Sequence, residues 1–416
     1  MVQNVLATTN TDSFGSNLCI KCRGRGFCRK PKCVYLEKMK SVEPVVKKIG
    51  KEFFGASPPS VFVGRVGYPN VFAGTLAPMD EGDTSKYDAP MMWHKGNWDI
   101  EKVLSHRMAL VNSRTKTNVK KTPNTLDTLK EIAMSKKSVD IEAHYSKPIQ
   151  QSIQFGGIAA PSGPCATIET LKLTENPNTS RKIEYVVSGT DFKANDAIQY
   201  LYRKKTDEGN IMKLLSIGIL GEKTQRKLVP TRWAITAVDD SLGKNLIEKI
   251  KHYPTINSPV LFRSQYLGNF FNILLLPRAW SYELIEMWHP QSVWTSGNNV
   301  SIGVDFENYF GRKTYASNTH GAYYAARLAV LEYIEKIKKQ ASILIVREIV
   351  PDYWAPLGVW VIREAVRGAF EEKSIDLENK NAINIIEDTL VCKKSGWQDK
   401  SNILNNILKQ KSITDY

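Results

Sequence analysis

Four closely spaced cysteines near the start of the chain constrain its fold more than any other feature. The spacing C-x2-C-x5-C-x4-C places them at Cys19, Cys22, Cys28 and Cys33. Four thiolates spaced in this way can surround one Zn²⁺ tetrahedrally at about 2.3 Å. Gly24 and Gly26 relieve steric conflict in the turn toward the third cysteine. A segment of about 25 residues cannot bury enough apolar surface to fold alone, so we predict one structural zinc ion that folds it.

Two other chemistries use the same residues. An iron–sulfur cluster also takes cysteine thiolates as ligands. Two disulfides would pair all four, but the first residues, MVQNVLATTNTD, lack the basic flank and apolar core of a secretion signal. We therefore expect a protein of the cytoplasm, where thiols stay reduced and zinc is favoured over disulfides.

Basic side chains crowd the same segment. The chain has 57 Lys and Arg against 42 Asp and Glu, a net charge of +15, and residues 18–51 contribute eleven basic and two acidic residues to it. Charge concentrated in one module indicates a surface for phosphates, although a solvated basic face or a zinc element that binds only protein is the alternative. Guanidinium groups suit phosphate and an aromatic ring suits a splayed base. The expected DNA contacts are Arg23, Arg25, Phe27, Arg29, Lys30 and Lys32.

The last seven residues, QKSITDY, carry a second pattern. Gln410, Ile413 and Tyr416 stand at positions one, four and seven of Q-x-x-h-x-x-a, which is typical of peptides that bind the sliding clamp PCNA. A short helical turn would place the aliphatic and aromatic side chains in one apolar pocket and the glutamine amide beside it. The pattern normally ends in two aromatic residues and only the first is present here, which indicates either weaker binding or a tail that is cut short.

The two ends and four blocks between them resemble the archaeal Nre family of DNA-repair proteins. The blocks are FVGRVGYPNVFAG (62–74), VPTRWAITAVDD (229–240), HGAYYAARLAVLEY (320–333) and REIVPDYWAPLGVWVIRE (347–364). The resemblance therefore spans almost the whole chain. It implies a role in DNA-damage repair alongside the replication clamp, in the cytoplasm of an archaeon, and it implies no catalytic mechanism.

Hydrophobic periodicity predicts a mixed α/β body. We expect strands over 139–145, 182–187, 212–220, 259–266, 269–276, 304–306 and 343–346, and helices over 98–108, 125–134, 229–253, 281–288, 319–338, 358–370 and 402–409. The expected parts are a zinc element with a basic connecting helix (1–50), an N-terminal α/β body (51–276), a C-terminal α/β body (277–392) and a flexible tail (393–416). The longest apolar run, 269–276, is strand-sized, so no membrane span is expected.

Few residues of the body suggest a pocket. Arg65 lies among glycines that could form a phosphate nest, although a plain strand and turn is the alternative. Arg232 and Asp239 would share a face of one helix, and the adjacent carboxylates of Asp239 and Asp240 suit metal-dependent phosphoryl chemistry or are simply solvated. His320 and Arg327 share a face of another helix and suit a phosphate or base, unless that helix is an ordinary amphipathic one. The candidate pocket residues are Arg65, His144, Arg232, Asp239, His320 and Arg327.

Two functions of different classes remain. The first is a DNA-damage repair factor that binds zinc and DNA and is recruited by the sliding clamp, since weak contacts joined in one chain gain avidity. The second is a clamp-recruited repair enzyme, a nuclease or a base- or nucleotide-processing enzyme, whose active site lies in the α/β body. The sequence has no G-x-S-x-G, H-E-x-x-H or Walker loop, so it leaves the question of catalysis open. The expected partners are the clamp, DNA and other repair proteins. An RNA-processing or translation factor would fit the charge but leave the tail unexplained.

Overall fold

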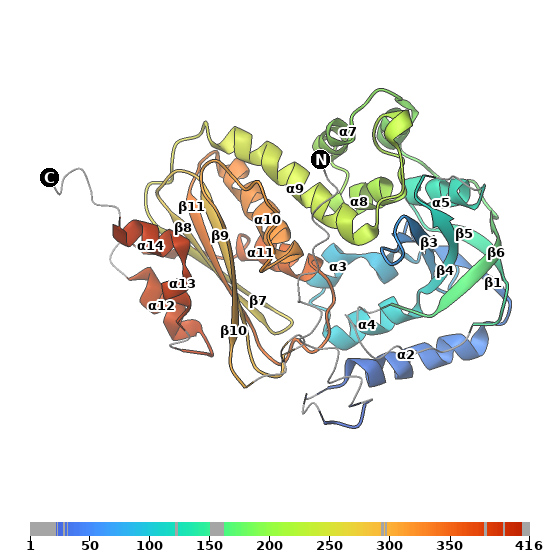
Figure 1. The fold of residues 1–416 in the computed structure, drawn as a ribbon, viewed down its shortest axis with the longest axis horizontal. Helices are drawn as coiled ribbons and strands as arrows, with labels where there is room; N and C mark the ends of the chain where they lie inside the picture. The colour runs from blue at the N-terminus through green and yellow to red at the C-terminus, as the bar shows by residue number, and fades with distance from the viewer. Residues whose placement is uncertain are drawn as a thin grey trace.

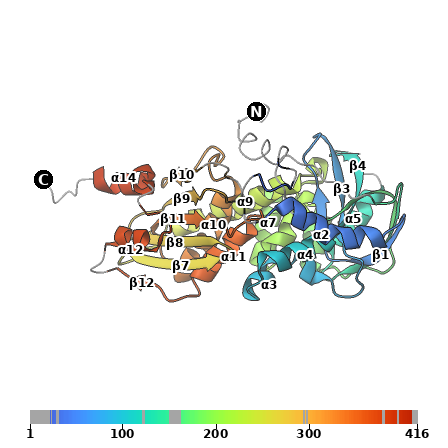
Figure 2. The same ribbon diagram turned by 90° about the horizontal axis from the view of Figure 1, so that it is seen from below.

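The computed structural model describes residues 22, 24–27, 30, 32–120, 124–149, 162–292, 295, 298–377, 381–393 and 396–409. Within these ranges the chain builds two six-stranded sheets, each with parallel and antiparallel neighbours. The sheets lie toward opposite ends of an elongated molecule, with helices between them (Figures 1 and 2). The expected mixed α/β class is confirmed.

The first sheet has the strand order β1-β5-β6-β4-β3-β2. Its strands are β1 (Glu52–Ser57), β2 (Val61–Val63), β3 (Asn70–Ala77), β4 (Val111–Asn118), β5 (Val139–Tyr145) and β6 (Cys165–Leu173). Buried and more exposed residues alternate along β5 and the start of β6. This sheet therefore packs one face on the core and gathers its exposed side chains on the other.

Short helices surround this first sheet. They are α2 (Val34–Lys48), α3 (Pro90–Lys95), α4 (Ile100–Ala109) and α5 (Asn124–Met134), with a 3₁₀ turn at Ser85–Asp88. The Asp99 carboxylate caps α4 by accepting a hydrogen bond from the backbone N–H of Lys102 at 2.7 Å, as an acidic N-cap residue does. Helix α5 packs against β2, β3 and β6.

The second sheet has the order β10-β9-β11-β8-β7-β12. Its strands are β7 (Val260–Tyr266), β8 (Asn269–Leu276), β9 (Ser281–Trp288), β10 (Ser301–Glu307), β11 (Ser342–Ile349) and β12 (Ile375–Asp376). All eight residues of β11 are buried. Ile343 and Ile345 belong to one apolar cluster and Leu344 and Val346 to another, so both faces of this sheet are covered.

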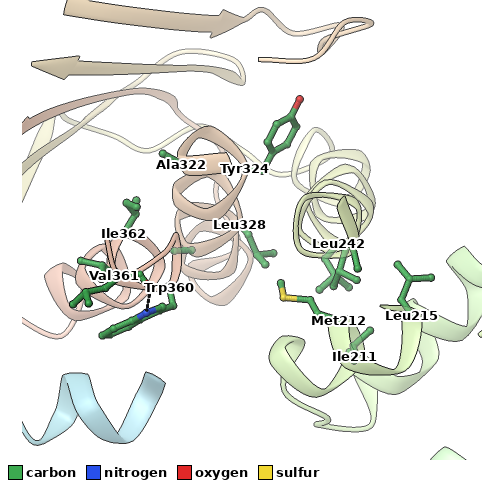
Figure 3. Packing of buried hydrophobic residues seen from close by; sticks show 14 of the residues in the cluster. Ile211, Met212, Leu215, Leu242, Ala322, Tyr324, Leu328, Trp360, Val361 and Ile362 are labelled. Atoms are coloured by element: carbon green, nitrogen blue, oxygen red, sulfur yellow. Dashed lines mark hydrogen bonds between the residues drawn. The ribbon is translucent and has the colours of Figure 1, made fainter. Parts of the chain in front are cut away.

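Different helices cover the two faces. The first cluster includes residues of α10 (Gly321–Ile337) and α11 (Trp360–Ala369), and the second includes residues of α12 (Ala382–Thr389), α13 (Trp397–Lys400) and α14 (Asn402–Lys409). Figure 3 shows the first cluster, where Leu328 of α10 lies close to Leu242 and Met212 of the neighbouring helices. The second sheet is thus the middle layer of a helix–sheet–helix arrangement.

Four helices and a 3₁₀ turn connect the two sheets. They are α6 (Arg181–Ser188), α7 (Ala194–Arg203), α8 (Glu208–Ser216) and α9 (Thr231–Ile250), with the turn at Lys223–Gln225. The strands expected over 182–187 and 212–220 are therefore wrong. The hydroxyl of Ser180 caps α6 and the carboxylate of Asp207 caps α8. These capping residues outweigh the β-branched residues of the first segment and the apolar residues of the second.

The helix expected over 281–288 is also wrong, because these residues form β9. The apolar side chains of this segment are spaced as on an amphipathic helix, but six consecutive residues from Tyr282 to Met287 are buried. A strand covered on both faces loses the alternation that would identify it in the sequence. The other expected elements are confirmed in type, with small differences at their ends.

Side chains of the two halves meet between the sheets. The rings of Trp93 on α3 and Trp360 on α11 are 5.3 Å apart, and the Tyr266 hydroxyl donates to the Trp98 carbonyl at 2.9 Å. The boundary expected at residue 277 falls between β8 and β9, which are strands of one sheet, and the division into domains stays a prediction. In the described ranges no helix has the length and apolar character needed to cross a membrane.

Candidate nucleic-acid interface

Helices α9 and α10 run side by side in the same direction. The Tyr253 hydroxyl, just after α9, donates to Glu335 near the end of α10 at 2.8 Å. At the other end, the Thr236 hydroxyl oxygen is 3.9 Å from the place where a Cβ on Gly321, the first residue of α10, would stand. The amino-terminal ends of the two helices therefore lie together.

Helix α11 runs parallel to α10 as well. Cγ1 of Val359, directly before α11, lies 3.0 Å from the same Cβ position on Gly321, and Arg367 near the end of α11 donates to Glu332 of α10 at 2.8 Å. Three helix N-termini thus meet in one region. Each carries a partial positive charge from its aligned peptide dipoles, so the region favours anions.

Buried ion pairs hold the three parallel helices together. Arg363 of α11 donates to both carboxylate oxygens of Asp239 on α9, at 2.8 and 2.6 Å. Arg327 of α10 binds Asp240 of α9 at 2.6 Å and Glu307 of β10 at 2.8 Å. Asp239 and Arg327 are therefore both buried, and each is paired with a charged side chain of a neighbouring element. Asp239 and the exposed Arg232 do not line one cleft.

Exposed aromatic and basic side chains surround the start of α9. The rings of Tyr68 and Trp233 are 5.2 Å apart, and the turn that carries Tyr68 is attached to α9 by a 2.9 Å hydrogen bond from the Val63 N–H to the Thr231 hydroxyl. Tyr315 and His320 lie next to it, with ring centres 6.0 Å apart. We call this surface the aromatic–basic face and define it by Arg65, Tyr68, Arg232, Trp233, Tyr315 and His320.

The Arg232 guanidinium and the buried Asp305 carboxylate act on the titratable groups of this face in opposite directions. Partial burial, followed by the nearby Arg232 guanidinium, lowers the pKa of His320 below its usual range, so the ring is neutral at pH 7 and can donate or accept one hydrogen bond. Burial raises the pKa of Tyr315 above its ordinary value, although the same arginine opposes this shift. Tyr324 lies behind Tyr315, with ring centres 5.6 Å apart, and it is a buried member of the apolar cluster drawn in Figure 3.

The candidate pocket residues predicted from the sequence separate into three groups. Arg232, His320 and the turn carrying Arg65 belong to the aromatic–basic face. Asp239 and Arg327 lie in the buried ion pairs. His144 is on β5 of the first sheet, where its ring nitrogens are 3.9 and 3.8 Å from carboxylate oxygens of Glu52 and Glu142, and it belongs to neither group.

Two of the four predicted zinc ligands, Cys22 and Cys33, are described, whereas Cys19 and Cys28 lie outside the described residues. Cys22 is buried and its carbonyl accepts a hydrogen bond from the Arg25 N–H at 2.8 Å, which closes a tight turn. Gly24 has φ +81°, a conformation that suits glycine. Cys33 is the N-cap residue of α2. Among the described residues no group of three or more His, Cys, Asp or Glu side chains is placed to hold a metal ion, and the zinc site stays a prediction.

The DNA contacts predicted in the cysteine segment fall into two groups, exposed side chains and lysines that contact the body. Arg25 and Phe27 are exposed, and the Phe27 side chain is 63% accessible. Lys30 donates to the Ser292 carbonyl at 2.9 Å, and Lys32 pairs with Glu101, so these two lysines attach the segment to the body. Arg23 and Arg29 lie outside the described residues, as do Gln410, Ile413 and Tyr416 of the predicted clamp-binding tail.

The sequence analysis missed three aromatic members of the face, Tyr68, Trp233 and Tyr315. Two of them had some indication in the sequence: Tyr68 stands beside a glycine–proline turn, in GYP, and Trp233 stands at a helix start, in TRW. Such residues pack into a core more often than they are exposed, so only the exposure of about 40–50% in the structure distinguishes them.

Comparison with known proteins gives concordant matches. The profile described as archaeal Nre, N-terminal, matches residues 27–295, and the one described as archaeal Nre, C-terminal, matches residues 307–416. The chain is 37% identical to the DNA repair protein NreB of Archaeoglobus fulgidus, over 93% of this chain and 96% of that protein. It is 40% identical to NreA of the same organism, over 85% and 89% of the two chains, and 37% identical to NreA of Haloferax volcanii, over 79% and 80%. No solved structure matches the chain.

Proposed function

Because the chain belongs to the archaeal Nre family, we propose that it is a DNA-damage repair factor that binds DNA through the aromatic–basic face. Its curated relatives are named DNA repair proteins. In the same proposal, the four cysteines hold a structural zinc ion and the C-terminal tail recruits the protein to the sliding clamp.

The observation that carries the proposal is the meeting of three helix N-termini with exposed aromatic and basic side chains. Phosphate oxygens bind to helix N-termini and to guanidinium groups, which fix a nucleic acid without selecting its sequence. The rings of Tyr68, Trp233 and Tyr315 offer stacking surfaces beside those phosphate contacts. This combination suits a factor that recognises a disturbed backbone or an unpaired base more than one that selects a sequence.

The position of α14 supports binding of DNA and of the sliding clamp at the same time. This helix ends at Lys409, directly before the predicted clamp-binding residues, and lies at the end of the molecule remote from the first sheet (Figure 1). The buried Glu283 carboxylate accepts hydrogen bonds from the backbone N–H groups of Asn402 and Ile403 at 2.7 and 3.0 Å, which fixes the start of α14. A clamp bound to the tail would therefore leave the aromatic–basic face accessible, and the two contacts would gain avidity.

The DNA-binding test replaces Arg232 by Glu and, separately, Trp233 by Ala. We expect each variant to bind labelled gapped duplex about tenfold or more weakly in fluorescence anisotropy, since phosphate and stacking contacts are each worth 1 kcal/mol or more. Arg232→Glu should also reduce the slope of log affinity against log salt by about one. The matched controls are Lys172→Glu on β6 and Phe54→Ala on β1, which are exposed on the first sheet. Equal binding by the Arg232 and Trp233 variants and the wild type would place DNA elsewhere.

Zinc and clamp binding each need their own measurement. Cys22→Ser should abolish stoichiometric zinc in atomic absorption, and an unchanged zinc content would refute the site.

Ile413→Ala combined with Tyr416→Ala should abolish the heat of binding to the sliding clamp in calorimetry. Retained heat would mean that the terminal pattern is accidental.

The enzyme alternative stays a hypothesis. Its candidate carboxylate, Asp239, is occupied by Arg363. A cleavage assay on nicked, gapped and base-damaged DNA with Mg²⁺ or Mn²⁺ separates the two functions. Time-dependent product that is lost in His320→Ala would make the protein an enzyme.

A further inference from the structure

A second group of basic side chains lies on strands β3 and β4 of the first sheet. In the paired register of these strands, Lys116 stands opposite Phe72 and Arg114 stands opposite Gly74. Successive side chains of a strand point to opposite faces of a sheet, and Ala73, between Phe72 and Gly74, is fully buried in the core. We call the outer side of these strands the strand surface and define it by Asn70, Phe72, Arg114, Lys116 and Lys120.

The cations of the strand surface lack acidic partners. Among the residues that the structure describes, no carboxylate oxygen lies within 4.0 Å of the side-chain nitrogens of Arg114, Lys116 or Lys120. Arg114 and Lys116 are two residues apart on one face of β4, a separation of about 7 Å along the strand, so their positive charges repel each other. A bound anion would relieve this repulsion, whereas a neutral ligand would not.

The Arg114 guanidinium is held in place by its neighbours. Its central carbon lies 4.5 Å from the centroid of the Phe72 ring, a distance at which a cation and an aromatic ring attract each other. A Cβ on Gly74 would stand 2.8 Å from the Cβ of Arg114, so the glycine leaves the space in which the arginine lies over β3. A guanidinium group fixed in this way can donate to phosphate and stack on a base without first being ordered.

Contacts between neighbouring segments join the strand surface to the aromatic–basic face. The turn between β2 and β3 carries Tyr68, whose ring is 5.2 Å from that of Trp233. The carbonyl of Pro69, the next residue, accepts a hydrogen bond from the Val119 N–H at 3.0 Å. Lys120 follows directly and is exposed. The strand surface therefore begins beside Tyr68 and continues along β3 and β4.

The chemistry of the strand surface favours a single strand among anionic ligands. Basic and aromatic side chains on an exposed sheet are typical of surfaces that bind single-stranded nucleic acid, where bases stack on rings or guanidinium planes and the phosphates follow the positive charge. An intact duplex keeps its bases stacked inside the helix, so it could use the charges but not the fixed guanidinium plane. The position of Arg114 over Phe72 would then serve no purpose in binding.

We propose that the strand surface binds a single-stranded segment of DNA that extends from the aromatic–basic face at a gap or a flap. This inference rests on the proposed function, because it needs DNA on that face. Lys116 and Lys120 contact phosphates, and the Arg114 guanidinium stacks on a base. The protein would therefore prefer DNA in which a strand has been displaced, without reading its sequence.

The test uses two labelled DNAs, the gapped duplex of the DNA-binding test and the same duplex with a flap of about twelve thymidines at the gap, a length within the usual site size of such surfaces. We expect the wild type to bind the flapped DNA more tightly. Arg114→Gln combined with Lys116→Gln should weaken binding to the flapped DNA about tenfold or more in fluorescence anisotropy and change binding to the gapped duplex less than about twofold. For the flapped DNA, the slope of log affinity against log salt should fall by about 1.4, because two contacts to a single strand are lost.

Two further variants make the result specific. Arg114→Lys keeps the charge and removes the planar group, so it should keep the salt slope and still weaken binding to the flapped DNA about fivefold or more. Lys136→Gln combined with Lys137→Gln removes two exposed charges between α5 and β5 and should change neither affinity. Removal of repelling surface charges should leave the unfolding midpoint of each variant within about 1–2 °C of the wild type.

A measurement on the wild type does not depend on how the variants fold. 5-Iodouracil in the flap crosslinks to nearby aromatic side chains under ultraviolet light. We expect mass spectrometry to place the crosslinks on β3 or β4, where Phe72 is the aromatic residue of the strand surface. Crosslinks confined to other parts of the chain would overturn the inference.

The outcomes separate this inference from the proposed function. If the Arg114 and Lys116 double variant binds the flapped DNA as the wild type does while Arg232→Glu weakens binding to both DNAs, the inference is wrong and DNA binding on the aromatic–basic face stands. If the wild type binds neither DNA, both proposals fall. If the double variant weakens binding to both DNAs by the same factor, the strand surface contacts duplex and its assignment to a single strand is overturned.

Discussion

The two sheets have the same number of strands and very different surroundings. Along β11 in the second sheet every residue is buried, whereas along β6 in the first sheet Cys165, Thr167 and Glu169 are exposed. The second sheet is covered by helices on both faces, and exposed side chains such as Phe54, Glu142 and Lys172 stand in one registered row across the first. The second sheet is thus a buried scaffold, whereas one face of the first sheet is exposed.

The difference teaches where this chain uses buried charge. In the second sheet the carboxylates of Glu283, Glu286 and Glu348 are buried, and each accepts hydrogen bonds from side chains or backbone groups of another element. Buried carboxylates are costly unless every lone pair is used. They therefore help to specify which strands, helices and loops lie beside each other, whereas no carboxylate is buried on the described strands of the first sheet.

The largest expected effect comes from removing one of these anchors. Glu283→Ala should lower the free energy of unfolding by about 3–5 kcal/mol, because the backbone N–H groups of Asn402 and Ile403 and the Ser401 hydroxyl lose a buried acceptor. The measurement is urea-induced unfolding followed by circular dichroism. Glu142→Ala, which removes an exposed carboxylate of β5, should change the same quantity by less than about 0.5 kcal/mol. Similar losses in the two variants would remove the distinction between the sheets.

The next effect concerns the helices that connect the sheets. Burial alone would raise the pKa of Glu208, but Arg363 and Arg367 outweigh it and lower the pKa from 4.5 to about 2. The ionised group therefore contributes stability above about pH 4.5 that is lost as the pH falls toward 2. Glu208→Gln should lower the free energy of unfolding by up to about 3 kcal/mol at pH 7, since a difference of one in pKa corresponds to about 1.4 kcal/mol.

The pH dependence of the difference tests this ion pair. Unfolding of the wild type and Glu208→Gln should differ most above pH 5 and converge near pH 2. Burial raises the pKa of Asp239 to about 6, and this shift has the opposite sign, so stability from that group falls as the pH rises from about 4 to 6. Glu208 contributes to the raised pKa of Asp239, so the difference between the two proteins reports on this coupled pair of carboxylates. A difference that is constant with pH would mean that the carboxylate acts only through packing.

A smaller effect is expected where the two halves meet. Tyr266→Phe removes the hydroxyl that donates to the Trp98 carbonyl and keeps the ring. We expect a loss of about 1 kcal/mol in the free energy of unfolding, as for a typical hydrogen bond. Differential scanning calorimetry would measure it. Two resolved transitions in the variant, against one in the wild type, would show that this contact couples the halves.

The smallest effect is expected on the exposed row of the first sheet. Phe54→Ser replaces a ring that is 43% accessible on β1, and it should change the free energy of unfolding by about 1 kcal/mol or less. Urea titration beside the wild type measures it. A loss above 2 kcal/mol would mean that something covers this row in solution.

The sequence by itself determined the family and most of the elements. Four separated blocks carried the resemblance to Nre proteins, and the long helices and the hairpin strands β7 and β8 were predicted because their periodicity is strong. The misassigned segments are explained physically: α6 and α8 are rich in β-branched and large apolar residues, and β9 is buried on both faces. Local pattern does not distinguish a buried strand from a buried helix.

Only the tertiary structure decided which candidate residues act together. Arg232 and Asp239 lie seven residues apart on one helix, yet one is exposed and the other is buried against Arg363. The parallel packing of α9, α10 and α11, which brings their N-termini together, depends on contacts between segments some 30 to 130 residues apart. Such contacts leave no periodic trace in the sequence, because each residue's partner is set by how the layers pack and not by its neighbours along the chain.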